Sequence, residues 1–112
     1  MAATARLWFG RIPAEKAADY FEYVKKTGVK DLRATPGNLG VLLLRRPVGE
    51  EVEIGVLSLW RSPQDIVAFA GPRIERAVYY PEDREYLIEL APELVHYEVT
   101  LAENLELGTA AG

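Results

Sequence analysis

The sequence predicts an α+β fold of the ferredoxin-like type, a sandwich in which a four-stranded antiparallel sheet carries its helices on one face. Three observations support the predictions of this fold, of a single domain and of a second covered sheet face. The segments follow the order strand, helix, strand, strand, helix, strand. The chain has 112 residues, 49% of them apolar, and no long linker, which is typical of one domain. Both faces of the central strands are apolar. We place the core of this single domain (residues 1–112) at about residues 5–101 and a C-terminal tail at residues 102–112.

The first predicted strand and the first predicted helix lie on either side of Pro13. Residues 5–12 form a short apolar run, which Pro13 ends. The segment after it has apolar residues at helical spacing, so that Ala17, Tyr20, Phe21 and Val24 share one face. We expect Gly28 to close this helix.

The next two strands form a predicted hairpin. A Thr-Pro-Gly turn at residues 35–37 precedes residues 38–47, which are rich in valine and leucine. Residues 51–60 form the second strand, and the short connection between the two segments indicates that they pair directly.

The second half of the chain begins with a short helix. Ser62 is the expected N-cap, a proline follows at the first helical position, and Gly71 ends the helix. We expect a second helical piece up to about residue 79, followed by a turn and a helical fragment at residues 80–90. The alternating segment 93–101 is the last predicted strand.

The two central strands have apolar side chains at both parities, in residues 39–44 and in residues 52–60. Helices can cover only one face of such a sheet, and a monomer rarely leaves a large apolar face in water. We therefore expect a second copy of the chain to cover the other face, which makes the protein a homodimer.

Composition excludes several classes of function. The net charge is -4 and the two signs are interspersed, so the chain lacks the basic face of a nucleic-acid-binding protein. It has no cysteine, which excludes disulfides, thiolate metal sites and cysteine nucleophiles. No apolar run approaches the ~20 residues of a membrane span, and no signal peptide precedes Arg6, so we expect a cytoplasmic protein without a membrane partner.

Five segments together carry a family pattern: Leu7-Trp8 and residues 36–46, 58–71, 77–83 and 95–99. With these segments, over about residues 5–101, the chain resembles the antibiotic biosynthesis monooxygenase family of dimeric α/β barrels. The resemblance implies that two sheets face each other across a dimer axis, and that each subunit keeps a pocket between its sheet and its helices. Some members oxidise aromatic polyketides there without metal or flavin, and others degrade haem.

Trp60 ends the predicted strand at residues 51–60, just before the helix cap. As a core residue it would seal the junction between helix and sheet. As a pocket wall it would stack on an aromatic ligand and donate a hydrogen bond from its indole N–H. The sequence leaves both interpretations open.

His96 is the only histidine, so it is the candidate for a catalytic base near neutral pH. It is either a neutral structural residue or the group that accepts a proton from a phenolic substrate. The second interpretation requires its side chain to border a cavity near Trp60, between the sheet and the helices. No serine or cysteine nucleophile accompanies it.

The remaining candidates for a substrate site are mainly aromatic. Residues 73–84 combine three arginines with two tyrosines, a pattern typical of a solvated face with local ion pairs, or of a pocket mouth for an anionic or phenolic ligand. The predicted substrate-binding residues are Trp8, Ser58, Trp60, Phe69, Arg73, Tyr79 and Tyr80.

We predict no metal and no cofactor. One histidine among scattered carboxylates lacks the paired spacing of a metal site. In the haem-degrading members of the family, the resemblance implies an asparagine on the first strand and a tryptophan in the second helix. It also implies an iron-ligating histidine at the end of that helical region. This chain has no asparagine in residues 5–12, and Phe69 and Tyr79 stand near the other two places.

Two functions follow from these observations. The first is a cofactor-independent monooxygenase that acts on a small aromatic or quinol-type molecule, with His96 handling the proton in a dry site. The alternative is a non-catalytic homodimer of the same fold that binds a small molecule or is purely structural. The predicted pocket has few polar groups, and this keeps both functions open.

Overall fold

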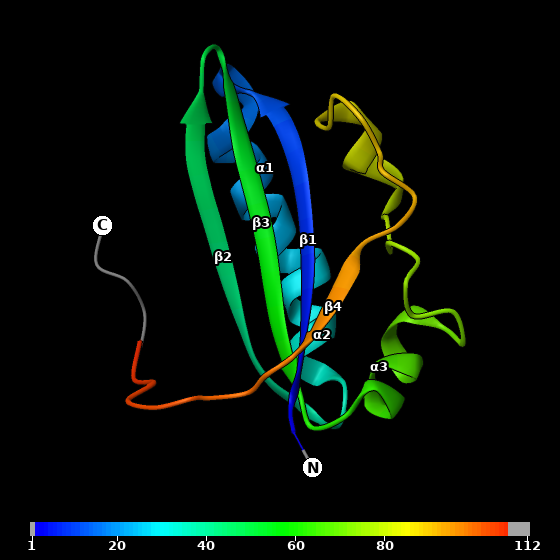
Figure 1. Ribbon diagram of the computed structural model, residues 1–112. Coiled ribbons are helices and arrows are strands. Elements are labelled where there is room, and N and C mark those ends of the chain that lie inside the picture. The colour runs from blue at the N-terminus through cyan, green and yellow to red at the C-terminus, as the bar shows by residue number, and fades with distance from the viewer. Residues whose placement is uncertain (1, 108–112) are drawn as a thin grey trace.

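The computed structural model describes residues 2–107 and contains a four-stranded sheet (Figure 1). Its strands are β1 (Thr4–Pro13), β2 (Asn38–Val48), β3 (Glu51–Trp60) and β4 (Val95–Glu98). They lie in the order β2-β3-β1-β4, and each neighbouring pair is antiparallel. The predicted ferredoxin-like α+β class is confirmed.

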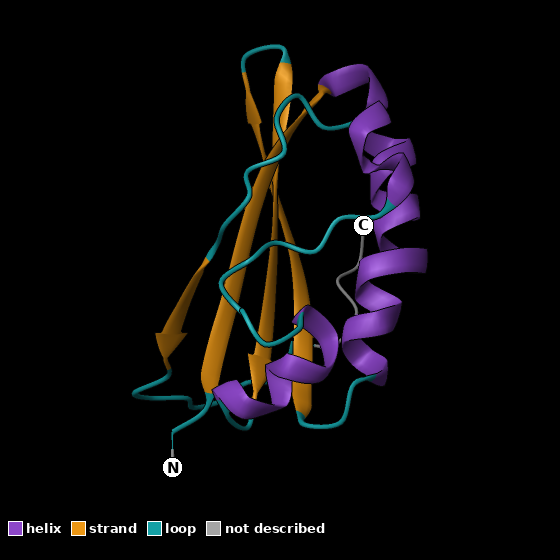
Figure 2. Ribbon diagram, turned by 90° about the vertical axis from the view of Figure 1, so that its right-hand side faces the viewer, coloured by secondary structure: helices purple, strands orange, loops and turns teal. Residues whose placement is uncertain are grey.

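A long helical stretch covers one face of this sheet (Figure 2). It consists of η1 (Ala14–Lys16), α1 (Ala17–Val24), η2 (Lys25–Val29) and α2 (Lys30–Ala34). The predicted end at Gly28 is wrong, because the chain passes through Gly28 in a wider π turn and continues. Leu32 explains this continuation: it is buried against Trp60 and Ile66, and such packing outweighs the low helix propensity of one glycine.

The helix α3 (Pro63–Ala70) has the predicted bounds, with Ser62 before it and Gly71 after it. The Ser62 hydroxyl bonds the Asp65 carboxylate at 3.2 Å and caps no backbone N–H. No described helix is long and apolar enough to cross a bilayer.

The helical piece predicted between Gly71 and residue 79 does not form. The backbone of this segment pairs instead with the approach to β4, through bonds from Ala77 N to the Pro92 carbonyl and from Leu94 N to the Glu75 carbonyl. These long-range partners satisfy backbone groups that a helix would have used internally. The predicted fragment within residues 80–90 is present as η3 (Pro81–Glu85).

The strand predicted at residues 93–101 is shorter than expected. β4 pairs only with the first half of β1, from Thr4 to Leu7. Residues 99–107 contain no strand or helix, and most of their side chains are exposed. Residues 108–112 of the predicted tail lie outside the described residues.

The core lies between the sheet and the helical stretch. Even-numbered residues of β1 and β3 face the helices, so that Ile12, Ile54 and Trp60 are fully buried. Tyr20 and Val24 of α1 pack against the first two of these. The alternation predicted for the strands therefore fixes which side chains face the helical layer.

The opposite face of the sheet is apolar and exposed among the described residues. Phe9 and Leu44 are 47% and 39% exposed, and Val95 and Tyr97 of β4 are each more than half exposed. This apolar outer face is what the sequence predicted. The homodimer that we expect to cover it stays a prediction.

Candidate functional site

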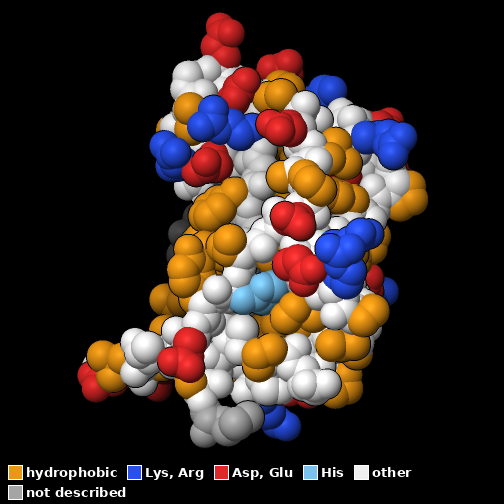
Figure 3. Space-filling view, turned by 45° about the vertical axis from the view of Figure 1, so that its right-hand side comes forward, with side chains coloured by type: hydrophobic (Ala, Val, Ile, Leu, Met, Phe, Trp, Pro, Cys, Tyr) orange, Lys and Arg blue, Asp and Glu red, His pale blue; other side chains and the backbone are white. Residues whose placement is uncertain are grey.

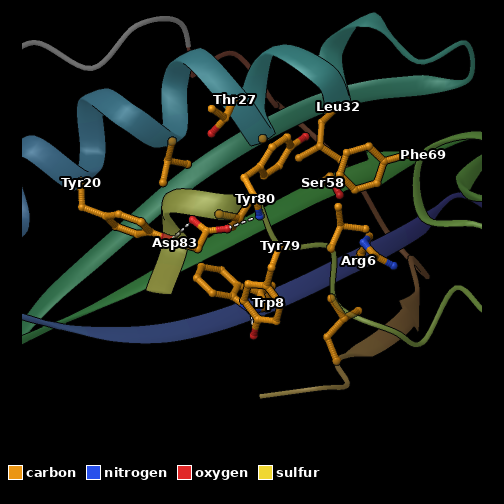
Figure 4. A pocket seen from close by; sticks show the side chains of 15 residues that line it. Arg6, Trp8, Tyr20, Thr27, Leu32, Ser58, Phe69, Tyr79, Tyr80 and Asp83 are labelled. Atoms are coloured by element: carbon orange, nitrogen blue, oxygen red, sulfur yellow. Dashed lines mark hydrogen bonds between the residues drawn. The ribbon is translucent and has the colours of Figure 1, made fainter. Parts of the chain in front are cut away.

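A cavity lies between the sheet and the helical stretch, and residues 78–83 form part of its wall (Figure 4). Strand β1 contributes Arg6 and Trp8, helix α1 contributes Tyr20, and the segment after α3 contributes Tyr79, Tyr80 and Asp83. With its open mouth included the cavity contains about 550 Å³ of empty space, but its free interior is only about 70 Å³. The widened turn η2 also borders it, through Thr27 and Gly28, as π turns frequently do at functional sites.

Arg6 is a buried cation at one end of this cavity. It shares the parity of Trp8 and Ile12, so it points toward the helices, and it is only 4% exposed. Its guanidinium donates to the backbone carbonyls of Ile74 and Arg76. Burial lowers the pKa of Arg6 to about 10, so the side chain is still charged at neutral pH.

His96 lies directly opposite Arg6 in the pairing of β4 with β1. Its Nε2 atom is 3.0 Å from Arg6 Nη1. Since a guanidinium only donates, Nε2 accepts this bond and the imidazole proton must reside on Nδ1. Burial lowers the pKa of His96, and the Arg6 charge lowers it further, whereas Glu75 raises it.

His96 therefore does not have the position that a catalytic base requires. It does not line the cavity, contrary to our expectation, and the acceptor nitrogen faces Arg6. The pale blue side chain of the single histidine reaches the molecular surface beside acidic and basic groups (Figure 3). Strand pairing explains why His96 lies outside the cavity lining. It places residue 96 opposite residue 6, and the Arg6 side chain borders the cavity instead.

Asp83 is a buried carboxylate in the cavity wall, 5% exposed. The Tyr20 hydroxyl donates to its Oδ1 at 3.2 Å, and the Tyr80 backbone N–H donates to its Oδ2 at 2.6 Å. The second bond arises locally, because Asp83 is the third residue of η3 and reaches back to the start of that helix. Burial raises the pKa of Asp83, although both hydrogen bonds oppose this effect.

Aromatic side chains form the wall between Arg6 and Asp83. Trp8 donates from its indole nitrogen to the Tyr79 hydroxyl at 3.1 Å, and that hydroxyl donates to the Ala91 carbonyl. The two rings meet edge to face at 6.1 Å. Trp8 fits because residue 10 is glycine: a Cβ there would lie 2.7 Å from the indole ring.

Trp60 lies in the core behind the cavity. It is fully buried with Leu32 and Ile66, and its indole N–H donates to the Ser58 hydroxyl at 2.9 Å. The prediction that Trp60 contacts a ligand is therefore corrected: Phe69, which packs against its ring at 6.5 Å, lines the cavity in its place.

Arg73 also lies away from the cavity. It is exposed and forms an ion pair with Glu75 at 3.2 Å, which is the local pairing that the sequence left open. The other five predicted substrate-binding residues line the cavity: Trp8, Ser58, Phe69, Tyr79 and Tyr80.

Sequence reasoning missed the two charged groups of the site. Arg6 carried a usable signal, because a charged residue at the buried parity of an apolar strand requires a partner. Asp83 carried none, since it lies among Glu82, Arg84 and Glu85 and resembles a solvated charge run. Within residues 2–107, no three or more histidine, cysteine or acidic side chains form a cluster that could hold a metal ion.

Comparison with known proteins identifies the fold. No protein-family model matches the sequence, and no curated protein sequence matches it. Among solved structures, a protein from Nitrosomonas europaea assigned to the antibiotic biosynthesis monooxygenases aligns with a TM-score of 0.65 at 14% identity. The alignment covers 88% of this chain and 91% of that one.

Two further structures give the same picture. A Bacillus cereus protein assigned to the same monooxygenases has a TM-score of 0.65 at 12% identity, over 92% of this chain and 98% of that one. A haem-degrading protein from Mycobacterium tuberculosis, in its haem-free form, has a TM-score of 0.62 at 22% identity. It covers 91% of this chain and 99% of its own. The chain thus shares the fold of these proteins, as its sequence predicted.

Proposed function

We propose that this chain, which has the fold of the antibiotic biosynthesis monooxygenases, binds a small aromatic or quinol-type molecule and oxygenates it without a cofactor. One observation carries the proposal: a buried carboxylate, Asp83, lies in the aromatic wall of the cavity. A carboxylate whose pKa is raised by burial is a stronger base than one in water, and general bases of this kind are typical of active sites.

In this proposal the base is Asp83, and His96 has a different role. The Asp83 oxygens have lone pairs beyond those that accept from Tyr20 and Tyr80, so one can receive a substrate proton. The acceptor nitrogen of His96 is engaged by Arg6, and His96 holds that guanidinium in place.

The chemistry requires dioxygen as the only co-reactant. A proton passes from the substrate to Asp83, and the substrate anion then transfers one electron to dioxygen. The substrate radical and superoxide combine at a ring carbon. The proton that Asp83 accepted then completes a hydroperoxide. Loss of water, which takes the remaining hydrogen of that carbon, leaves a carbonyl group. The protein has only to deprotonate the substrate and keep water away, as a cavity among aromatic side chains does.

Haem, which the fold suggests through its haem-degrading neighbours, does not fit the described residues. The only histidine does not line the cavity, and its Nε2 accepts from Arg6. A free interior of about 70 Å³ is also far smaller than a porphyrin. We therefore derive no step through haem.

The proposal includes that the protein is a cytoplasmic homodimer. The apolar outer face, with Phe9 and Tyr97 exposed, is the surface that a second copy would cover. Exposed contiguous apolar surface of this kind is typical of an interface between identical chains.

Oxygen uptake with 1,4-dihydroxynaphthalene as the quinol tests the proposal. The wild-type chain should consume oxygen faster than buffer, and Asp83→Asn should lose about 10²-fold or more of this rate. The asparagine oxygen can still accept from Tyr80 N–H, so the variant should stay folded. Glu82→Gln makes the same carboxylate-to-amide change at the exposed neighbouring residue, so it is the matched control and should retain most of the rate. An inactive wild-type protein, or an active Asp83→Asn variant, would refute the proposal.

A non-catalytic binding protein is the second candidate, and the narrow interior of the cavity favours it. Pockets for drug-sized ligands usually measure about 300–1,000 Å³, and an interior of about 70 Å³ holds an aromatic ring only after its wall moves. Saturable binding of the quinol without any oxygen uptake would identify this function.

A further inference from the structure

The charge of Arg6 has no ion-pair partner among the described residues. No carboxylate lies within salt-bridge distance of its guanidinium in the described part of the chain. Its acceptors are two backbone carbonyls and a neutral imidazole, and the centre of the Phe69 ring lies 5.8 Å from its Cζ. A buried charge is usually paired, because the loss of hydration is otherwise uncompensated.

Arg6 also has hydrogen-bond donors to spare. Three of its five N–H groups are used: both on Nη1, toward Ile74 and His96, and one on Nη2, toward Arg76. The Nε–H and the second Nη2–H have no acceptor among the described residues. Two donors on neighbouring nitrogens suit the two oxygens of a carboxylate.

The position of Arg6 connects this unpaired charge with the cavity. Arg6 lines the cavity at the end beside Phe69, and Asp83 lies on the other side of Tyr79 and Tyr80 (Figure 4). Asp83 already accepts two hydrogen bonds, so it does not neutralise the guanidinium. The Arg6 end of the cavity therefore carries a guanidinium charge without an ion-pair partner.

We propose that the cavity binds an aromatic acid, whose carboxylate pairs with Arg6 while its phenol or quinol group points toward Asp83. This inference rests on the proposed function and adds the substrate class, a hydroxylated aromatic carboxylate. His96 is a positioning residue in this site, because it orients the guanidinium and makes no contact with the ligand.

A purely structural Arg6 is the competing explanation. Its bonds to Ile74 and Arg76 anchor the segment after α3 to strand β1, and this anchoring needs donors but no ligand. The two explanations differ in what they predict for ligand charge. An anchor is indifferent to the charge of the ligand, whereas an anion site distinguishes an acid from its neutral amide.

Calorimetric titration of the wild-type protein with 4-hydroxybenzoate and 4-hydroxybenzamide, without oxygen and at neutral pH, makes this comparison. The probes are of nearly equal size and differ in charge. The acid should bind about tenfold or more tightly, as charge-assisted hydrogen bonds predict. Arg6→Met, which keeps an apolar stem, should remove the preference, and Arg6→Lys should retain part of it. Melting curves establish whether each variant is folded. If Arg6→Met does not fold, the affinities of the wild-type protein for the acid and the amide decide the question without it.

Equal affinity for both probes, or no binding of either, would overturn the inference. A preference that persists in folded Arg6→Met would also overturn it, since the acid would then bind elsewhere. The result is independent of catalysis: a preference for the acid without oxygen uptake supports the anion site and refutes the oxygenation. Oxygen uptake together with equal affinities for the acid and the amide supports the oxygenation and refutes the anion site.

Discussion

Truncation of Trp60 should be the most destabilising single change in the second core cluster. The side chain is fully buried with Leu32 and Ile66, so Trp60→Ala removes the whole ring and leaves a cavity. Such substitutions cost about 3–5 kcal/mol in the free energy of unfolding. A ring that merely lined a pocket would cost far less, so the magnitude distinguishes the core position from the pocket wall.

The hydrogen bond from Trp60 to Ser58 can be measured separately with a double-mutant cycle. Ser58→Ala leaves the buried indole N–H without an acceptor, which costs about 1–3 kcal/mol. Trp60→Phe removes the donor. When both are changed no polar group of the pair is left unpaired, so the double variant should be more stable than the sum of the single effects by about 1 kcal/mol.

Equilibrium unfolding in urea, followed by circular dichroism, provides these free energies. All variants have to be compared at one protein concentration, because the stability of the homodimer that we expect would depend on it. A cost of about 1 kcal/mol or less for Trp60→Ala would refute the core assignment. Additive single effects, within about 0.3–0.5 kcal/mol, would show that the bond between Trp60 and Ser58 contributes nothing.

Three further predictions concern the histidine, haem and the outer face. The pKa of His96 should lie below 6.5, and the single N–H of the neutral ring should be on Nδ1; NMR of the imidazole can measure both. The unfolded histidine then binds its proton first as the pH falls, so stability should decrease below about pH 6.5, and a pKa above that value would contradict this. Haem should cause no saturable shift of the Soret band; a tight shift that one substitution abolishes would overturn that expectation. Light scattering after size exclusion should give a dimer for the wild type and a monomer for Phe9→Glu, and a well-folded wild-type monomer would exclude our interface.

Local patterns were sufficient to predict most of the sheet and one helix. The strand Glu51–Trp60 and the helix Pro63–Ala70 have the expected bounds, because turn residues and alternation encode them locally. The errors occur where distant contacts decide. Leu32 extends the first helix beyond Gly28 by packing on α3 and the sheet. Residues 71–79 form no helix because their backbone partners lie near β4.

The candidate site was predicted in its aromatic part and at Ser58, but not in its charged groups. Trp8, Phe69 and Tyr79 were found because aromatic side chains on a strand, on a helix and in the segment after it are natural candidates for a pocket wall. His96 was favoured by elimination, as the only imidazole, but residue type alone does not give position. The pairing of β4 with β1 assigns it to the guanidinium of Arg6.

The two charged groups of the cavity lie on parts of the chain that are stabilised in different ways. Arg6 belongs to a central strand with neighbours on both sides, so its backbone is fixed by the sheet. Asp83 belongs to the irregular segment between α3 and β4, which is attached to the rest of the fold by individual bonds such as those of Trp8 to Tyr79 and Tyr80 to Asp31. Segments with few regular backbone bonds are the ones that open at low cost in free energy. A ring larger than the present interior should therefore enter by displacement of the Asp83 side, while the Arg6 side stays in place.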